Sequence, residues 1–138
     1  MNELAMVSLY PHHEITPKAR GEIVQLVPYS TAEGLVLRVN ETRIDAAVAI
    51  EFKEAVRRAA EAPGNPVILD LSKVAFLDSS GLGAVVAVMK LLAPDRALQL
   101  AALSPSVAKV FRLTRMDSVF TIHPEVPGTA PPARKATG

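Results

Sequence analysis

The segment VILDL, residues 67–71, is the most continuous run of strand-forming side chains in the sequence. A strand covered on both faces carries apolar residues at successive positions, whereas a half-exposed strand alternates between apolar and polar ones. Residues 67–71 therefore predict the central strand of a sheet that other elements cover. A second apolar segment, residues 74–77, follows it directly.

Strand and helix patterns alternate before this segment. Residues 22–29 and 35–40 have the composition of two strands, and residues 30–34 supply a turn that makes them a hairpin. Apolar residues then recur at helical spacing over residues 46–62, with Asp45 placed as a good N-cap.

The alternation continues after the central strand. We expect Ser79 or Ser80 to cap a helix that runs to Leu92, and Ser104 to cap a later helix with Pro105 as its first residue. The remaining expected elements are a strand in 97–103, the body of the later helix in 106–116 and a short last strand in 119–123.

The resulting order is β β α β α β α, with a short β at the end. Strands that alternate with helices of this length favour an α/β fold with a mostly parallel sheet. With 138 residues, 49% of them hydrophobic, the chain is long enough for one core and too short for two. We expect one domain over residues 21–123. Residues 1–20 would form an arm before it, and the Pro- and Ala-rich residues 124–138 would form a mobile tail after it.

Composition narrows the function. The 15 Lys and Arg residues nearly balance 14 Asp and Glu residues, and no basic run provides a footprint for nucleic acid. There is no cysteine for a disulfide or a thiolate zinc site. The first ten residues lack the pattern of a signal peptide, and the longest apolar run, residues 81–93, is too short for a membrane span. We therefore expect a cytoplasmic protein that binds neither nucleic acid nor membranes.

Asp78, Ser79, Ser80 and Gly81 connect two apolar segments and raise the question of why two hydroxyls stand together. A serine there could be a nucleophile, a helix cap or a phosphorylation target. A hydrolase would need a nucleophile elbow and a nearby base, but the G-x-S-x-G pattern is absent. The histidines, His12, His13 and His123, lie in the segments least expected to be rigid. We therefore expect no enzyme activity.

A cap explains one hydroxyl and leaves the rest of the motif unexplained. Gly81 and Gly83 in the first helical turn each cost about 1 kcal/mol relative to Ala. Their presence suggests that a partner or a phosphate approaches that backbone closely. Leu82, between them, is either an apolar anchor for a partner or a core residue.

Other polar residues give weaker signals. Asp70 could be a metal ligand, but a carboxylate with only Asp78 nearby is more often a hydrogen-bond acceptor for a loop. Adjacent His12 and His13 lack the spacing of metal ligands on a helix. We expect no metal and no cofactor.

Residues 67–92, VILDLSKVAFLDSSGLGAVVAVMKLL, closely resemble the core of STAS domains, specifically the bacterial anti-sigma factor antagonists. Residues 43–56 resemble the stretch that leads into the first helix of that family, and residues 103–123 resemble its last helix and strand. The resemblance covers the expected domain, residues 21–123. It implies a four- or five-stranded sheet with helices mainly on one side.

The resemblance also implies partner switching in transcription regulation. The unmodified domain would bind a serine kinase that is itself an anti-sigma factor, as a monomer or weak dimer. Phosphorylation of the residue that corresponds to Ser79 would break the complex, and a phosphatase would restore it. The implied binding surface comprises Asp45, Asp78, Ser79, Ser80, Gly81, Leu82 and Gly83. The sequence departs from the family at 42–45, Thr-Arg-Ile-Asp, where a β-branched residue stands in an expected turn.

Two other functions remain open at this stage. The same fold could serve as a scaffold subunit of a stress-sensing or other partner-switching assembly that does not act on a sigma factor, and it would then form large particles. A small hydrolase using Ser79 is the other alternative, and an organophosphonate probe would label it.

Overall fold

The computed structural model of the chain describes residues 24–128. The expected N-terminal arm and residues 129–138 of the expected tail lie outside the described residues. In chain order the elements are β1 (Leu26–Thr31), β2 (Gly34–Val39), β3 (Arg43–Ile44), α2 (Ala49–Ala59), β4 (Val67–Asp70), β5 (Phe76–Leu77), α3 (Ser79–Leu92), β6 (Leu98–Ala101), α4 (Pro105–Leu113), the 3-10 helix η2 (Met116–Ser118) and β7 (Ile122–His123).

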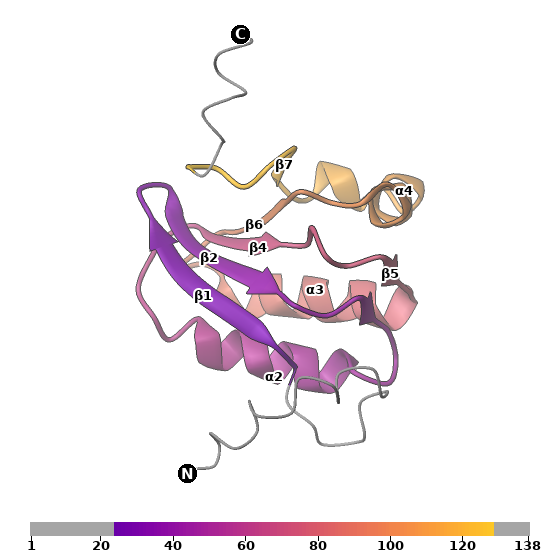
Figure 1. Cartoon of the computed structure of the whole chain (residues 1–138), viewed down its shortest axis with the longest axis horizontal. Coiled ribbons are helices and arrows are strands. Elements are labelled where there is room, and N and C mark those ends of the chain that lie inside the picture. Colours follow the sequence, from indigo (N-terminus) through magenta and orange to yellow (C-terminus); the bar gives the residue numbers. More distant parts are fainter. Residues whose placement is uncertain (1–23, 129–138) are drawn as a thin grey trace, which may run out of the picture.

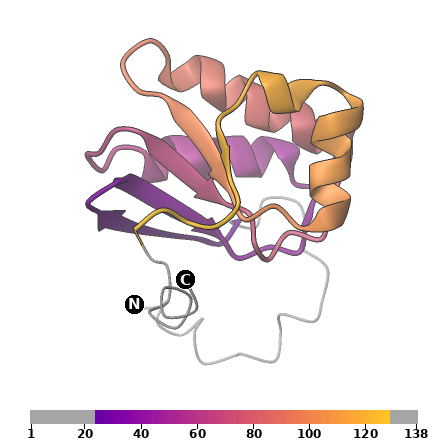
Figure 2. The same cartoon turned by 90° about the horizontal axis from the view of Figure 1, so that it is seen from above.

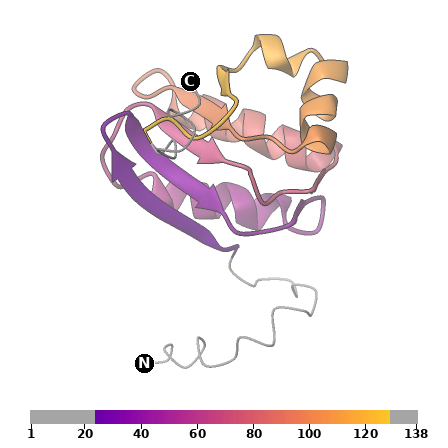
Figure 3. The same ribbon diagram turned by 45° about the horizontal axis from the view of Figure 1, so that its top comes forward.

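Five of the strands form one mixed sheet in the order β1-β2-β4-β6-β7, and β3 and β5 form a separate two-stranded sheet. Strand β1 pairs antiparallel with β2, and every later pairing in this sheet is parallel. Helices α2 and α3 lie side by side along one face (Figures 1 and 3). The α/β fold with a mostly parallel sheet, predicted from the sequence, is confirmed.

Strand β4 is the central strand, as the sequence predicts. All four of its residues are buried, because β2 and β6 flank it and its two faces contact different apolar clusters. Leu69 packs among the residues under α2 and α3, whereas Ile68 points to the opposite face. The apolar run at successive positions is therefore explained by burial on both faces.

The opposite face of the sheet holds a small second cluster. Val36, Ile68 and Ala101 are fully buried there. Val126 packs on them, and only 9% of its own surface is exposed. The chain therefore continues to pack after β7, at a residue that we expected to belong to the tail. The composition of residues 124–138 did not indicate that a single valine fits the second face of the sheet.

Helix α2 is shorter than residues 46–62 at both ends. Its N-cap is Val48 and not Asp45, since residues 46–48 form a turn closed by a hydrogen bond from the Val48 N–H to the Asp45 carbonyl oxygen (3.0 Å). At the other end, the N–H groups of Glu61 and Ala62 donate to carbonyls three residues back. This tighter hydrogen bonding is common where an α-helix ends.

Helix α4 lies at the end of the sheet beside β5 (Figure 2). Ser104 and Pro105 stand at the predicted N-cap and first helical position. The Ser104 hydroxyl does not cap the helix, because it donates to the Val74 carbonyl oxygen (2.8 Å) instead. Ser106 likewise donates to the carbonyl oxygen of Ala75 (2.7 Å), so both serines fasten α4 to the segment that leads into β5.

Candidate functional site

A two-stranded parallel ladder supports the start of α3. Strands β3 and β5 pair with Ile44 opposite Leu77. Asp45 and Asp78, the next residues on each strand, therefore leave the ladder at the same end. The N–H of Asp78 donates to the Ile44 carbonyl oxygen (3.4 Å), which holds the two chain segments together as they diverge into α2 and α3.

The carboxylate of Asp78 ties the starts of both helices together. One oxygen accepts a hydrogen bond from the Gly81 N–H (2.9 Å), and the other accepts one from the Ala46 N–H (3.2 Å). Asp78 is therefore the N-cap of α3, and the expectation that Ser79 or Ser80 caps the helix was wrong. A carboxylate suits this position because the helix dipole favours negative charge at the N-terminus.

With the cap supplied by Asp78, the two serines become the first residues of the helix. Ser79 and Ser80 are both exposed. Neither hydroxyl makes a hydrogen bond within the part of the chain that the structure describes, residues 24–128. The local structure thus does not use these hydroxyls, and they are accessible to a partner.

The two glycines of the motif have different surroundings. A β-carbon on Gly81 would lie 2.1 Å from the Ile44 carbonyl oxygen, far closer than any real contact. Gly81 is buried, so the close approach that we inferred from the sequence comes from Ile44 of the same chain. Gly83 is exposed, and a β-carbon there would meet nothing within 4 Å. Only Gly83 leaves its backbone open to a partner.

Leu82 and Asp45 are both half-buried. Leu82 packs against the main core, so at least part of its side chain serves the fold. The Asp45 carboxylate accepts a hydrogen bond from the Ala47 N–H (3.1 Å) and forms an ion pair with the Nε of Arg43 (3.2 Å). Asp45 therefore shapes the turn before α2. Asp78 contacts the same turn, because its carboxylate accepts the hydrogen bond from the Ala46 N–H.

The sequence analysis missed an exposed pair beside this loop. The guanidinium of Arg43 lies 4.2 Å from the centre of the Phe76 ring, and the two side chains are 59% and 40% exposed. The departure from the family at residues 42–45 is Thr42, a β-branched residue where the family commonly has a glycine. Thr42 is exposed at a bend directly before β3, and its carbonyl oxygen accepts hydrogen bonds from the N–H groups of Ala75 (2.8 Å) and Phe76 (3.1 Å). Ile44 is a buried strand residue. The alternation of exposed and buried residues in Arg43–Ile44 and Phe76–Leu77 was the available signal.

The weaker candidates behave as structural residues. Asp70 is buried and accepts a hydrogen bond from the Ser72 N–H (3.0 Å), which is the loop-acceptor role considered above. His123 pairs with Gln99 (Nε2 to Oε1, 2.7 Å), whereas His12 and His13 lie outside the described residues. Residues 24–128 contain no group of three or more His, Cys, Asp or Glu side chains that could hold a metal. In the same range, no helix has both the length and the apolar character needed to cross a membrane.

The fold and the site together define a small α/β domain that presents two exposed hydroxyls at the first turn of a carboxylate-capped helix. The model of the STAS domain family matches residues 25–128. The chain belongs to the STAS domain family.

Solved structures show the same fold. An anti-sigma factor antagonist from Mycobacterium paratuberculosis is 25% identical, with a TM-score of 0.65 over 75% of this chain and 87% of that one. An anti-sigma-factor antagonist (STAS) domain protein from Planctomyces limnophilus is 24% identical, with a TM-score of 0.58 over 80% and 96%. The Bacillus cell fate determinant SpoIIAA in the phosphorylated form is 22% identical, with a TM-score of 0.51 over 83% and 96%.

Proposed function

We propose that this protein is an anti-sigma factor antagonist that binds an anti-sigma factor serine kinase and is released from it when Ser79 is phosphorylated. The observation that carries the proposal is the exposed Ser79 hydroxyl at the first residue of α3, directly after the Asp78 cap. Family membership and the antagonist from Mycobacterium paratuberculosis support it. The domain is a binding module of the cytoplasm and not an enzyme in this proposal.

The chemistry of the switch follows from the position of Ser79. The kinase transfers the γ-phosphoryl group of ATP to the Ser79 oxygen, ADP leaves, and the hydroxyl proton is released. The phosphate brings a charge of about −1.5 to −2 to the helix N-terminus, where unpaired backbone N–H groups and the helix dipole favour anions. The fold therefore tolerates the phosphate.

A bound partner would meet the same phosphate very differently. Packing a protein surface against the start of α3 removes water from Ser79, and the new charge would then lie beside the Asp78 carboxylate. Unless the partner supplies matching cations, this desolvated charge weakens the complex. A phosphatase that removes the phosphate would restore binding, which completes the cycle.

The first test maps the phosphate. The kinase is recovered by co-purification from the native cell and incubated with ATP and the full chain, and the products are examined by mass spectrometry. Wild type and Ser80→Ala are expected to gain one phosphate, whereas Ser79→Ala gains none. A phosphate on Ser80, or the absence of any kinase partner, would contradict the proposal.

The scaffold alternative differs in assembly. An antagonist of this kind acts as a monomer or weak dimer, whereas a scaffold subunit assembles into large particles. Size-exclusion chromatography of the purified chain is expected to show a monomer or dimer. Elution as a large particle would favour the scaffold.

A further inference from the structure

A continuous groove runs between α2 and α3 on the surface of the domain. It comprises two shallow hollows of ≈ 360 Å³ and ≈ 190 Å³, and both are lined by Lys53 and Ala87. We call this feature the α2–α3 groove. The other lining residues are Ala49, Ile50, Glu54, Arg57, Ser80, Gly83, Ala84, Lys90 and Leu91.

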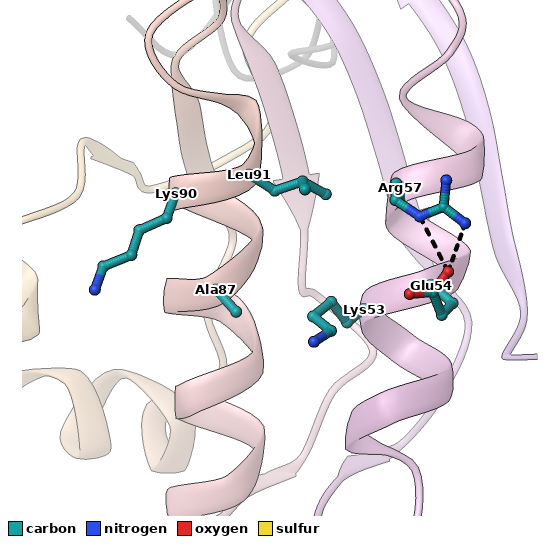
Figure 4. Close-up of a pocket in the computed structure, with 6 residues that line it drawn as sticks. All are labelled: Lys53, Glu54, Arg57, Ala87, Lys90 and Leu91. Carbon is teal, nitrogen blue, oxygen red and sulfur yellow. Dashed lines mark hydrogen bonds and ion pairs between the residues drawn. The ribbon is translucent and has the colours of Figure 1, made fainter.

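Six of the eleven lining residues are glycine or apolar, and four of these six are Gly or Ala. Gly83 and Ala87 have little or no side chain, so the surface of α3 that lines the groove stays close to its backbone. Leu91 extends from α3 toward α2 (Figure 4). Ile50 on α2 is 70% exposed and Leu91 is 49% exposed. A single exposed aliphatic side chain needs no explanation, but here Ile50 of α2 borders the smaller hollow and Leu91 of α3 borders the larger one next to it.

The charges of the groove are mostly positive. Three cations line it against one carboxylate, and that carboxylate is already engaged, because Glu54 pairs with Arg57 (Oε1 to Nη2, 2.6 Å). The hydrogen bond from Arg57 lowers the pKa of Glu54, so the pair stays ionised. Lys53 and Lys90 form no ion pair within residues 24–128. In Figure 4, Lys53 reaches across the groove toward Ala87, and Lys90 lies on the outer flank of α3.

From this combination we infer that the α2–α3 groove is a docking surface for an acidic amphipathic helix of a protein partner. The apolar face of such a helix would cover the hollows, and its carboxylates would pair with Lys53, which points across the groove. The groove follows α3, whose 14 residues span about 21 Å, which suits a partner helix of about four turns.

The groove is continuous with the serine pair, since Ser80 lines it at the start of α3. The identity of the partner rests on the proposed function: the helix would belong to the anti-sigma factor kinase. An acidic helix in the groove would also increase the difference in affinity between the unmodified and the phosphorylated chain, because a phosphate on Ser79 would repel it.

The charge of the groove argues against a second copy of this chain as the occupant. Two copies that met groove to groove would bring the net positive lining of each, with Lys53 at its centre, against that of the other, and like charges at an interface are repulsive. An anionic membrane surface could attract the same lysines, so the experiment below includes vesicles.

The test uses two synthetic 14-residue helical peptides with leucines along one face. One carries glutamates at the remaining positions and the other carries lysines. Binding to the full unphosphorylated chain is measured by fluorescence anisotropy at low salt. We expect the acidic peptide to bind at least tenfold more tightly than the basic one, and its affinity to fall as salt is raised.

Matched variants locate the contact. Lys53→Glu and Leu91→Asp are each expected to weaken binding of the acidic peptide at least tenfold. Lys109→Glu and Leu113→Asp, which change an exposed lysine and an exposed leucine on α4, should leave it unchanged. Melting curves of all four variants exclude unfolding as the cause.

Three results would overturn the inference: equal binding of the two peptides, loss of binding in the α4 variants alone, or tighter binding to phosphatidylglycerol vesicles with the same dependence on Lys53. The peptide assay needs neither the kinase nor a phosphate. If the peptide assay fails, the inference that the groove is a docking surface is refuted, and the Ser79 proposal is unaffected. If the phosphate mapping fails, the result of the peptide assay still holds.

Discussion

Gly81 lies against the backbone of Ile44 so closely that a β-carbon on Gly81 would be 2.1 Å from the Ile44 carbonyl oxygen. Together with the Asp78 carboxylate, which accepts from the N–H groups of Gly81 and Ala46, this contact fixes the first turn of α3 on the β3–β5 ladder. The exposed Ser79 hydroxyl thus stands on a helix start that is held by contacts of Asp78 and Gly81 and not by the serine itself.

This contact predicts opposite effects for the two glycines of the motif. Gly81→Ala should destabilise the domain by about 1 to 3 kcal/mol, because the added methyl group cannot avoid the Ile44 backbone. Gly83→Ala, at an open helical position, should stabilise it by up to about 1 kcal/mol. Urea unfolding of the two variants measures both. A Gly81→Ala protein as stable as Gly83→Ala would show that the helix start can shift.

Replacing the cap should cost more than replacing either serine. Asp78→Ala removes the acceptor for two backbone N–H groups, and we expect a loss of about 1 to 2 kcal/mol in the free energy of unfolding. Asp78→Asn, which retains a capping oxygen, should lose less. Thermal melts that rank Asn with Ala would contradict the capping role.

The central strand predicts the largest effect in the core. Leu69 is fully buried, so Leu69→Ala should cost about 2 to 5 kcal/mol through lost burial and a residual cavity. Leu113→Ala, which changes a 70% exposed residue on α4, should stay within about 0.5 kcal/mol of wild type. Denaturant midpoints of the two variants provide the comparison, and similar midpoints would refute the central position of β4.

The second face of the sheet makes its own prediction. Val126→Ala should destabilise the domain by about 1 to 2 kcal/mol, because Val126 covers Val36 and Ile68. Val119→Ala, at a half-exposed position, is the control and should be nearly neutral. If calorimetric melting temperatures of the two variants agree, residues after β7 do not contribute to the core.

Patterns confined to neighbouring residues were predicted well from the sequence. The continuous apolar run at 67–71, the hairpin and the helix that starts after Ser104 each depend on local spacing or local backbone preference. The start of α3 was misassigned, because the sequence favoured Ser79 or Ser80 as the N-cap and the structure has Asp78. Serine and aspartate are both good caps, and only the distance from the Asp78 carboxylate to the Gly81 N–H decides between them.

Contacts between segments distant in sequence could not be predicted in this way. Strands β3 and β5 have two residues each, and their pairing depends on a fold in which residues 43 and 76 meet. For the same reason, the sequence indicated that something approaches Gly81 without showing that it is Ile44. The burial of Val126 likewise requires knowledge of which side of the sheet α2 and α3 leave open.

The most direct test of the Ser79 switch is calorimetric titration of the recovered kinase with three forms of the chain: unmodified, Ser79→Ala and enzymatically phosphorylated. Because Asp78 provides the cap, Ser79→Ala should melt close to wild type and bind the kinase with unchanged affinity. The phosphorylated chain should also melt close to wild type, yet bind at least tenfold more weakly, a difference of about 1.4 kcal/mol or more. Equal affinity of the phosphorylated and unmodified chains would contradict the account.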